Sequence, residues 1–119
     1  HGDDGLDEIT ITSETNIAEL KDHKITEYKI SPKQFGISLA SFEKIYANSS
    51  QQSLMMVQEA FEGEKSPVQD MIAMNSGAAL YIARIVESIS DGVELAFELM
   101  NNGMASNKLA EYVRVSNNI

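Results

Sequence analysis

His1-Gly2-Asp3-Asp4-Gly5-Leu6-Asp7-Glu8 places four carboxylates within eight residues, and its two glycines allow tight turns between them. Carboxylates this close repel one another, so a folded chain tolerates them best when water or a cation lies between them. Their oxygens are hard ligands that suit Mg²⁺ or Ca²⁺. An EF-hand is excluded, because no register supplies its alternating acidic positions, central glycine and final glutamate. The stretch therefore predicts either a metal-binding loop or a solvated acidic segment.

The composition is that of one acidic globular domain. The 119 residues suffice for a single domain, and 43% apolar residues suffice for a core. A formal net charge of −9 argues against a surface for nucleic acid or anionic membranes. The chain has no cysteine, which fits a reducing compartment, and we expect a cytoplasmic protein. No apolar run approaches the roughly 18 residues of a membrane span.

The first part of the chain has the alternation typical of strands. Glu8–Thr12 alternates polar and apolar residues and is rich in β-branched side chains, so it predicts a short strand. Residues 16–20 and 25–30 predict two antiparallel strands joined across 21–24. We therefore expect a β-hairpin.

Helix signals dominate the remainder. Ser66-Pro67-Val68-Gln69 is the clearest start, with Ser66 as the N-cap, Pro67 in the first helical position and Gln69 completing a capping box. The expected helical segments are a short stretch at 42–46, a helix that begins within 48–52 and ends at Gly63, and helices at 66–86, 89–102 and 105–115, with fraying at 116–119.

These helices carry two expectations about packing. The helices 66–86 and 89–102 should pack on the sheet, and the last helix should bury Leu109, Tyr112 and Val113. Asn75-Ser76-Gly77 places poor helix formers in mid-helix, where small residues allow another backbone to approach closely. That stretch indicates either simple tight packing or contact with a substrate-bearing part of the domain.

The acidic stretch, read as His-Gly-x-Asp-Gly-Leu-Asp-Glu, resembles the acidic motif of anthranilate phosphoribosyltransferases, enzymes of tryptophan biosynthesis. The later segments of that family are matched with intact spacing by Glu27–Pro32 with Phe35-Gly36, Gly63–Pro67 with Asp70, Asn75–Tyr81, Ser88–Gly92 and Gly103-x-Ala105. The resemblance covers essentially the whole chain. It implies that residues 1–119 are the C-terminal third or so of such an enzyme, with the helical N-terminal domain and the phosphate loop upstream.

The resemblance also implies a site. Asp7 and Glu8 correspond to the pair that holds the Mg²⁺ accompanying phosphoribosyl pyrophosphate, the substrate that reacts with anthranilate. It assigns no further catalytic or cofactor-binding residue here, and it implies a homodimer for the full-length enzyme. Asp4 matches an aspartate of the family, whereas Asp3 falls at a variable position. Without the upstream part, we expect the chain alone to be inactive.

Other candidates carry simpler explanations. His1 and His23 have no partner in the sequence, and His23 is expected in an exposed turn. Glu64-Lys65-Ser66 could hold an anion at a helix start, although a capped, charged helix start is commoner. The six methionines are expected to fill the core.

The expected fold class is α/β, the C-terminal part of a nucleoside phosphorylase/phosphoribosyltransferase-type domain: a short strand, a β-hairpin and about four helices on a mixed sheet. Missing neighbouring strands would leave apolar surface and strand edges open. Two alternatives remain, a non-enzymatic paralogue that binds a macromolecule and a relative of pyrimidine-nucleoside phosphorylases. The negative charge argues against nucleic acid as that macromolecule. The adjacent Asp7 and Glu8 favour an enzyme, and Asp-Gly-Leu-Asp-Glu favours the transferase.

Overall fold

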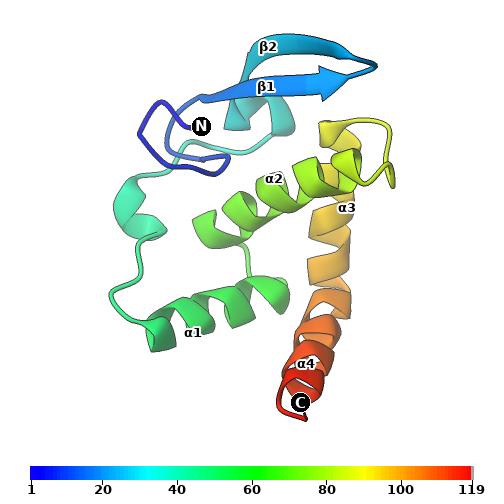
Figure 1. Cartoon of the computed structure of the whole chain (residues 1–119). Coiled ribbons are helices and arrows are strands. Elements are labelled where there is room, and N and C mark those ends of the chain that lie inside the picture. Colours follow the sequence, from blue (N-terminus) through cyan, green and yellow to red (C-terminus); the bar gives the residue numbers. More distant parts are fainter. Residues whose placement is uncertain (119) are drawn as a thin grey trace.

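A β-hairpin lies across one end of a group of helices (Figure 1). This computed structural model describes residues 1–118, so residue 119, the end of the segment expected to fray, lies outside the described part. The hairpin and four helices confirm the α/β expectation. The elements are β1 (Thr15–Lys21), β2 (Lys24–Ile30), two 3₁₀ turns at Pro32–Phe35 and Phe42–Lys44, α1 (Ser50–Phe61), α2 (Pro67–Ile82), α3 (Ile89–Asn101) and α4 (Met104–Ser116).

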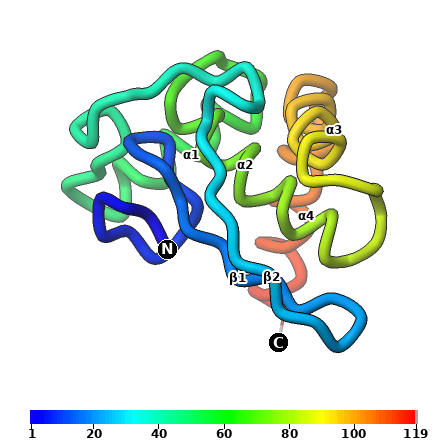
Figure 2. Tube along the Cα trace, turned by 90° about the horizontal axis from the view of Figure 1, so that it is seen from above, coloured from blue at the N-terminus to red at the C-terminus, as the bar shows by residue number. Residues whose placement is uncertain are grey.

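The predicted hairpin is confirmed. The strands β1 and β2 are antiparallel, in a register that runs from Thr15 opposite Ile30 to Lys21 opposite Lys24. A two-residue turn joins them, and Asp22 and His23 both have positive φ, 50° and 62°. Such a turn matches the right-handed twist of paired strands. His23 is an exposed turn residue, as expected, and Figure 2 shows this turn reaching away from the helices.

The strand predicted at residues 8–12 is wrong, because this segment pairs with no other strand in residues 1–118. Its backbone groups are satisfied mainly by side chains, and the carbonyl of Ile11 accepts the N–H of Ala40 at 3.1 Å. The N–H of Thr10 donates to Oγ1 of Thr15 at 3.1 Å, and both backbone groups of Ile9 bind the side chain of Asn75. A segment bonded in this way needs no neighbouring strand.

The start of α2 confirms one half of its predicted capping box and corrects the other. The hydroxyl of Ser66 accepts a bond from the N–H of Gln69 at 3.2 Å, and Pro67 is the first helical residue. The side chain of Gln69, however, is buried and donates instead to the carbonyl of Ala60 and to Oδ1 of Asn101. The carbonyl of Ala60 also accepts the N–H of Gly63 at 3.2 Å, so Gln69 adds a second donor to it and satisfies its own buried amide.

Helix α2 ends at Ile82, four residues before the expected end at Val86. Arg84 has φ 58°, and its N–H donates to the carbonyl of Tyr81 while that of Ile85 donates to Leu80. These two bonds form a Schellman motif, which usually has glycine at the left-handed position. Arginine occupies it here, so the sequence carried no stop signal.

The helices α2 and α3 meet backbone to backbone. A Cβ atom added to Gly92 would lie 2.3 Å from the carbonyl oxygen of Gly77, and one added to Gly77 would lie 2.6 Å from the N of Val93. The tight-packing interpretation of the small residues in α2 therefore holds at Gly77. The core around this crossing consists of Ile11, Ile30, Ile37, Ala73, Met74, Val93, Ala96 and Met100.

Two packing expectations are wrong. The helices α2 and α3 pack mainly on each other, and the hairpin joins the core chiefly at its base through Ile30. The helix α4 leads away from the core (Figure 1), and its contacts are with the end of α3 and with α1. Leu109 is half-buried, whereas Tyr112 and Val113 are 69% and 47% exposed. Exposed apolar side chains, including Leu20 at 71%, match the expected open surface.

Candidate metal site

The acidic stretch forms a closed loop against the start of β1. The N–H of Gly2 donates to the carbonyl of Leu6 at 2.9 Å, and the N–H of Asp3 donates to that of Glu14 at 2.8 Å. Gly5 has φ +94°, a conformation that glycine adopts without strain. The first eight residues are thus a shaped turn.

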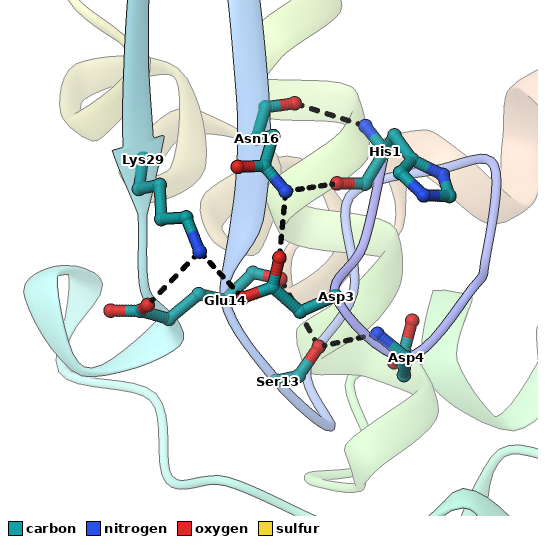
Figure 3. Close-up of polar contacts among 7 residues, drawn as sticks. All are labelled: His1, Asp3, Asp4, Ser13, Glu14, Asn16 and Lys29. Atoms are coloured by element: carbon teal, nitrogen blue, oxygen red, sulfur yellow. Dashed lines mark hydrogen bonds and ion pairs between the residues drawn. The ribbon is translucent and has the colours of Figure 1, made fainter.

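Asp3 is tied to the hairpin (Figure 3). Its carboxylate accepts bonds from Nζ of Lys29 and Nδ2 of Asn16, each at 2.7 Å. Lys29 also lies 3.7 Å from the carboxylate of Glu14. The bonds from Lys29 and Asn16 hold the pKa of Asp3 below its usual value. With its charge already paired, Asp3 is a poor metal ligand.

Asp4 holds the loop together from within. Its carboxylate accepts bonds from the hydroxyls of Thr10, at 2.6 Å, and Thr12, and from the N–H of Leu6, at 3.0 Å. Burial acts to raise the pKa of Asp4, but these bonds outweigh it and the pKa is lowered. Asp4 therefore has a structural role.

Asp7 and Glu8 are the acids that the loop leaves free. Both are exposed, and within residues 1–118 neither carboxylate has a hydrogen-bond or ion-pair partner. The adjacent positions are fixed, because the N–H of Leu6 binds Asp4 and the backbone of Ile9 binds Asn75. Across the same residues, no group of three or more histidine or acidic side chains is placed to hold a metal. The pair can supply only part of a coordination shell.

Asn75 also belongs to this site, although its contact with the loop was not predicted from the sequence. Its Oδ1 accepts the N–H of Ile9 at 3.0 Å, and its Nδ2 donates to the carbonyl of Ile9 at 2.7 Å and to that of Met71 at 2.9 Å. An asparagine in mid-helix was the available signal, since it disfavours the helix locally.

The remaining candidates lie outside the site or have other roles. His23 is at the hairpin turn, at the far end of the hairpin from the loop (Figure 1). The carbonyl of His1 accepts the N–H of Asn16, while its imidazole is exposed. The hydroxyl of Ser66 is occupied by capping. Among residues 1–118, no helix combines the length and apolar character needed to cross a bilayer.

The sequence matches known proteins along its length. The family described as "Glycosyl transferase family, a/b domain" matches residues 1–106. The chain is 41% identical over 116 residues to the anthranilate phosphoribosyltransferase of Vesicomyosocius okutanii, a match that covers 98% of this chain and 34% of the relative. The chain thus spans about a third of the length of the curated relatives it matches.

Solved structures agree in fold. Anthranilate phosphoribosyltransferase from Thermus thermophilus superposes with a TM-score of 0.86 at 29% identity, covering 96% of this chain and 33% of that chain. A variant of the Saccharomyces cerevisiae enzyme with Mg bound gives a TM-score of 0.85 at 19% identity, covering 99% and 35% respectively. At 19% identity, that likeness shows the fold alone.

Proposed function

Because this chain belongs to the glycosyl transferase family with an a/b domain, we propose that it is the C-terminal part of an anthranilate phosphoribosyltransferase. The observation that carries the proposal is the free, exposed Asp7–Glu8 pair, held in a loop whose two other acids are already engaged. The full-length enzyme transfers the phosphoribosyl group of phosphoribosyl pyrophosphate to anthranilate, a step of tryptophan biosynthesis.

Asp7 and Glu8 are the proposed Mg²⁺ ligands. Their oxygens are hard donors with no competing partner within residues 1–118, and Mg²⁺ commonly binds one or two carboxylates together with water and substrate phosphates. Two protein ligands therefore suffice. When bound, Mg²⁺ stabilises the negative charge that develops on the departing pyrophosphate. The Mg reported with the yeast structure of the same fold supports this choice of metal.

In the proposed reaction, the amine nitrogen of anthranilate bonds to C1 of the ribose while the bond from C1 to the pyrophosphate oxygen breaks. Asp7 and Glu8 would hold the Mg²⁺ that accompanies the pyrophosphate end of the substrate, and the proton that the amine nitrogen loses passes to water or to a group outside these 119 residues. Asp4 is unsuited to act as a base, because its carboxylate already accepts three hydrogen bonds.

The remaining parts of the active enzyme lie outside this chain in the proposal. We assign the helical N-terminal domain, the phosphate loop, the anthranilate site and the homodimer contact to the other two-thirds of the full-length protein. The 119 residues alone are then inactive. A cytoplasmic location is consistent with the absence of cysteine. The relatives matched give no support to a macromolecule-binding paralogue or to a phosphorylase.

Substitutions in the full-length protein that contains this sequence test the proposal. Activity is followed as the rate at which anthranilate fluorescence falls. Asp7→Asn and Glu8→Gln should each raise the Mg²⁺ concentration that gives half of the maximal rate by about 10-fold or more. Asp3→Asn is the matched control, because Asp3 is paired with Lys29 and should leave the Mg²⁺ dependence unchanged. Wild-type Mg²⁺ dependence in both substituted proteins would refute the metal assignment, and turnover by the 119-residue chain alone would refute the fragment assignment.

A further inference from the structure

We propose that Asn75 is a positioning residue for the Asp7–Glu8 pair, an inference that rests on the proposed metal role of that pair. Asn75 lies in the middle of α2, 66 residues beyond the loop segment that it binds. Asn75 forms no hydrogen bond with either carboxylate. It acts through the backbone of Ile9, the residue that follows Glu8.

The contact fixes the backbone on the C-terminal side of the pair. The N–H of Ile9 belongs to the peptide unit that it shares with Glu8, so the 3.0 Å bond to Asn75 sets the orientation of the Glu8 carbonyl. The 2.7 Å bond from Nδ2 to the carbonyl of Ile9 fixes the following peptide unit in the same way. Two successive peptide planes are thereby held by one side chain.

A second anchor fixes the N-terminal side. The N–H of Leu6 donates to Asp4, whose carboxylate is held in turn by the hydroxyls of Thr10 and Thr12. Asp7 and Glu8 therefore span a short bridge between two anchored residues. Their side chains remain exposed and free while the backbone that carries them is held at both ends.

The chemistry of this position requires a carboxamide. Asparagine presents one acceptor and two donors, and all three are used, the third in a 2.9 Å bond to the carbonyl of Met71 within α2. That third bond holds the amide in place toward the loop. An apolar residue of equal size would suit the helix better, because asparagine has low helix propensity. The residue is thus explained by the loop and not by the helix.

The test uses the deuterated, ¹⁵N-labelled full-length protein that contains these 119 residues, with two readouts. Amide hydrogen exchange at Ile9 reports the clamp, and line broadening by Mn²⁺ at Asp7 and Glu8, with and without inorganic pyrophosphate, reports metal binding. Asn75→Leu fills the same volume without hydrogen bonds. It should speed amide exchange at Ile9 at least 10-fold. It should also raise the Mn²⁺ concentration at which the broadening of the Asp7 and Glu8 signals is half-maximal by about 10-fold, which is the usual effect of losing a group that orients a metal ligand.

Ser76→Ala is the matched control, because Ser76 is on the same helix but faces the groove between α2, α3 and α4. It should change neither readout. Exchange at Val93, in the core, should stay within about 2-fold of wild type in the Leu variant, which separates a loop effect from unfolding. If that exchange rises as well, Asn75→Gln keeps a polar amide but displaces it by one methylene, and the same loss of Mn²⁺ binding is expected.

The outcomes separate this inference from the function beneath it. Faster exchange at Ile9 with unchanged Mn²⁺ broadening would overturn the positioning role and leave Asn75 as a loop contact only. An absence of Mn²⁺ broadening at Asp7 and Glu8 in the wild-type full-length protein would overturn the metal assignment itself. Loss of both Ile9 protection and Mn²⁺ binding, with the core intact, supports the proposal.

Discussion

Adding one methyl group at the crossing of α2 and α3 should destabilise the fold, although the same change normally stabilises a helix. In Gly92→Ala, the new Cβ would lie 2.3 Å from the carbonyl oxygen of Gly77 and 2.9 Å from both its Cα and its carbonyl carbon. All three are backbone atoms, which cannot rotate aside as a flexible side chain can. The two helices must therefore move apart.

The magnitude follows from two opposing effects. Replacing glycine by alanine in a helix interior stabilises it by roughly 1 kcal/mol. Overpacking a close-packed core costs about 1–3 kcal/mol, and rigid backbone neighbours place this substitution at the upper end. The expected net loss is about 2 kcal/mol, equivalent to roughly 8 °C in Tm for a domain of this size. Urea unfolding followed by circular dichroism at 222 nm measures it.

Ser76→Ala is the matched control, since it gains helix propensity in α2 without crowding this crossing, and it should be neutral or slightly stabilising. Gly77→Ala should behave like Gly92→Ala, because its Cβ would lie 2.6 Å from the N of Val93. A Gly92→Ala protein as stable as wild type, or more so, would refute the close backbone contact.

Three further predictions concern buried and titrating groups. Gln69→Leu removes two hydrogen bonds, one to the carbonyl of Ala60, which keeps the N–H of Gly63, and one to Oδ1 of Asn101, and should cost about 2 kcal/mol in urea unfolding; an unchanged midpoint would contradict these bonds. Burial, assisted by the bond to Glu19, raises the pKa of Tyr28 to about 12, so absorbance at 295 nm should show one tyrosine ionising last. The stability from this raised pKa is complete below pH 10.0 and is lost as the pH rises through the folded value, and Glu19→Gln should lower that value. For Asp4 the dependence of stability on pH has the opposite sign. Its pKa lies below 3.8, so its contribution to the stability of the fold is present above pH 3.8 and is lost as the pH falls through the folded value. Asp4→Asn should therefore reduce the loss of unfolding free energy at acid pH. An unchanged loss would count against the hydrogen bonds from the hydroxyls of Thr10 and Thr12.

The starts of the helices could be predicted because each depends on residues close together in the chain. The hydroxyls of Ser66 and Ser88 accept the N–H groups of Gln69 and Asp91, three residues on. Such caps are formed within one turn and need no distant partner. The hairpin was predictable for a similar reason, since its two strands are joined by a two-residue turn.

Two of the errors, the strand at residues 8–12 and the burial of the last helix, involve partners that are distant in the sequence or that the described residues do not supply. Residues 8–12 do not form the expected strand, because the side chain of Asn75 binds the backbone of Ile9. Tyr112 and Val113 have a helical apolar pattern, yet no neighbouring element covers them within residues 1–118. A pattern shows which residues can be buried, but burial also requires a second surface.

For the candidate site, the sequence by itself determined the chemistry: an acidic loop with glycines that allow it to turn, and the pair Asp7 and Glu8 within it. The tertiary structure decided which acids remain free. Asp3 is neutralised by Lys29, 26 residues away, and Asp4 is used to close the loop, so the free carboxylates are those of the pair. The reason is physical, because the availability of a carboxylate depends on the donors that surround it in space, and folding brings those donors from distant parts of the chain.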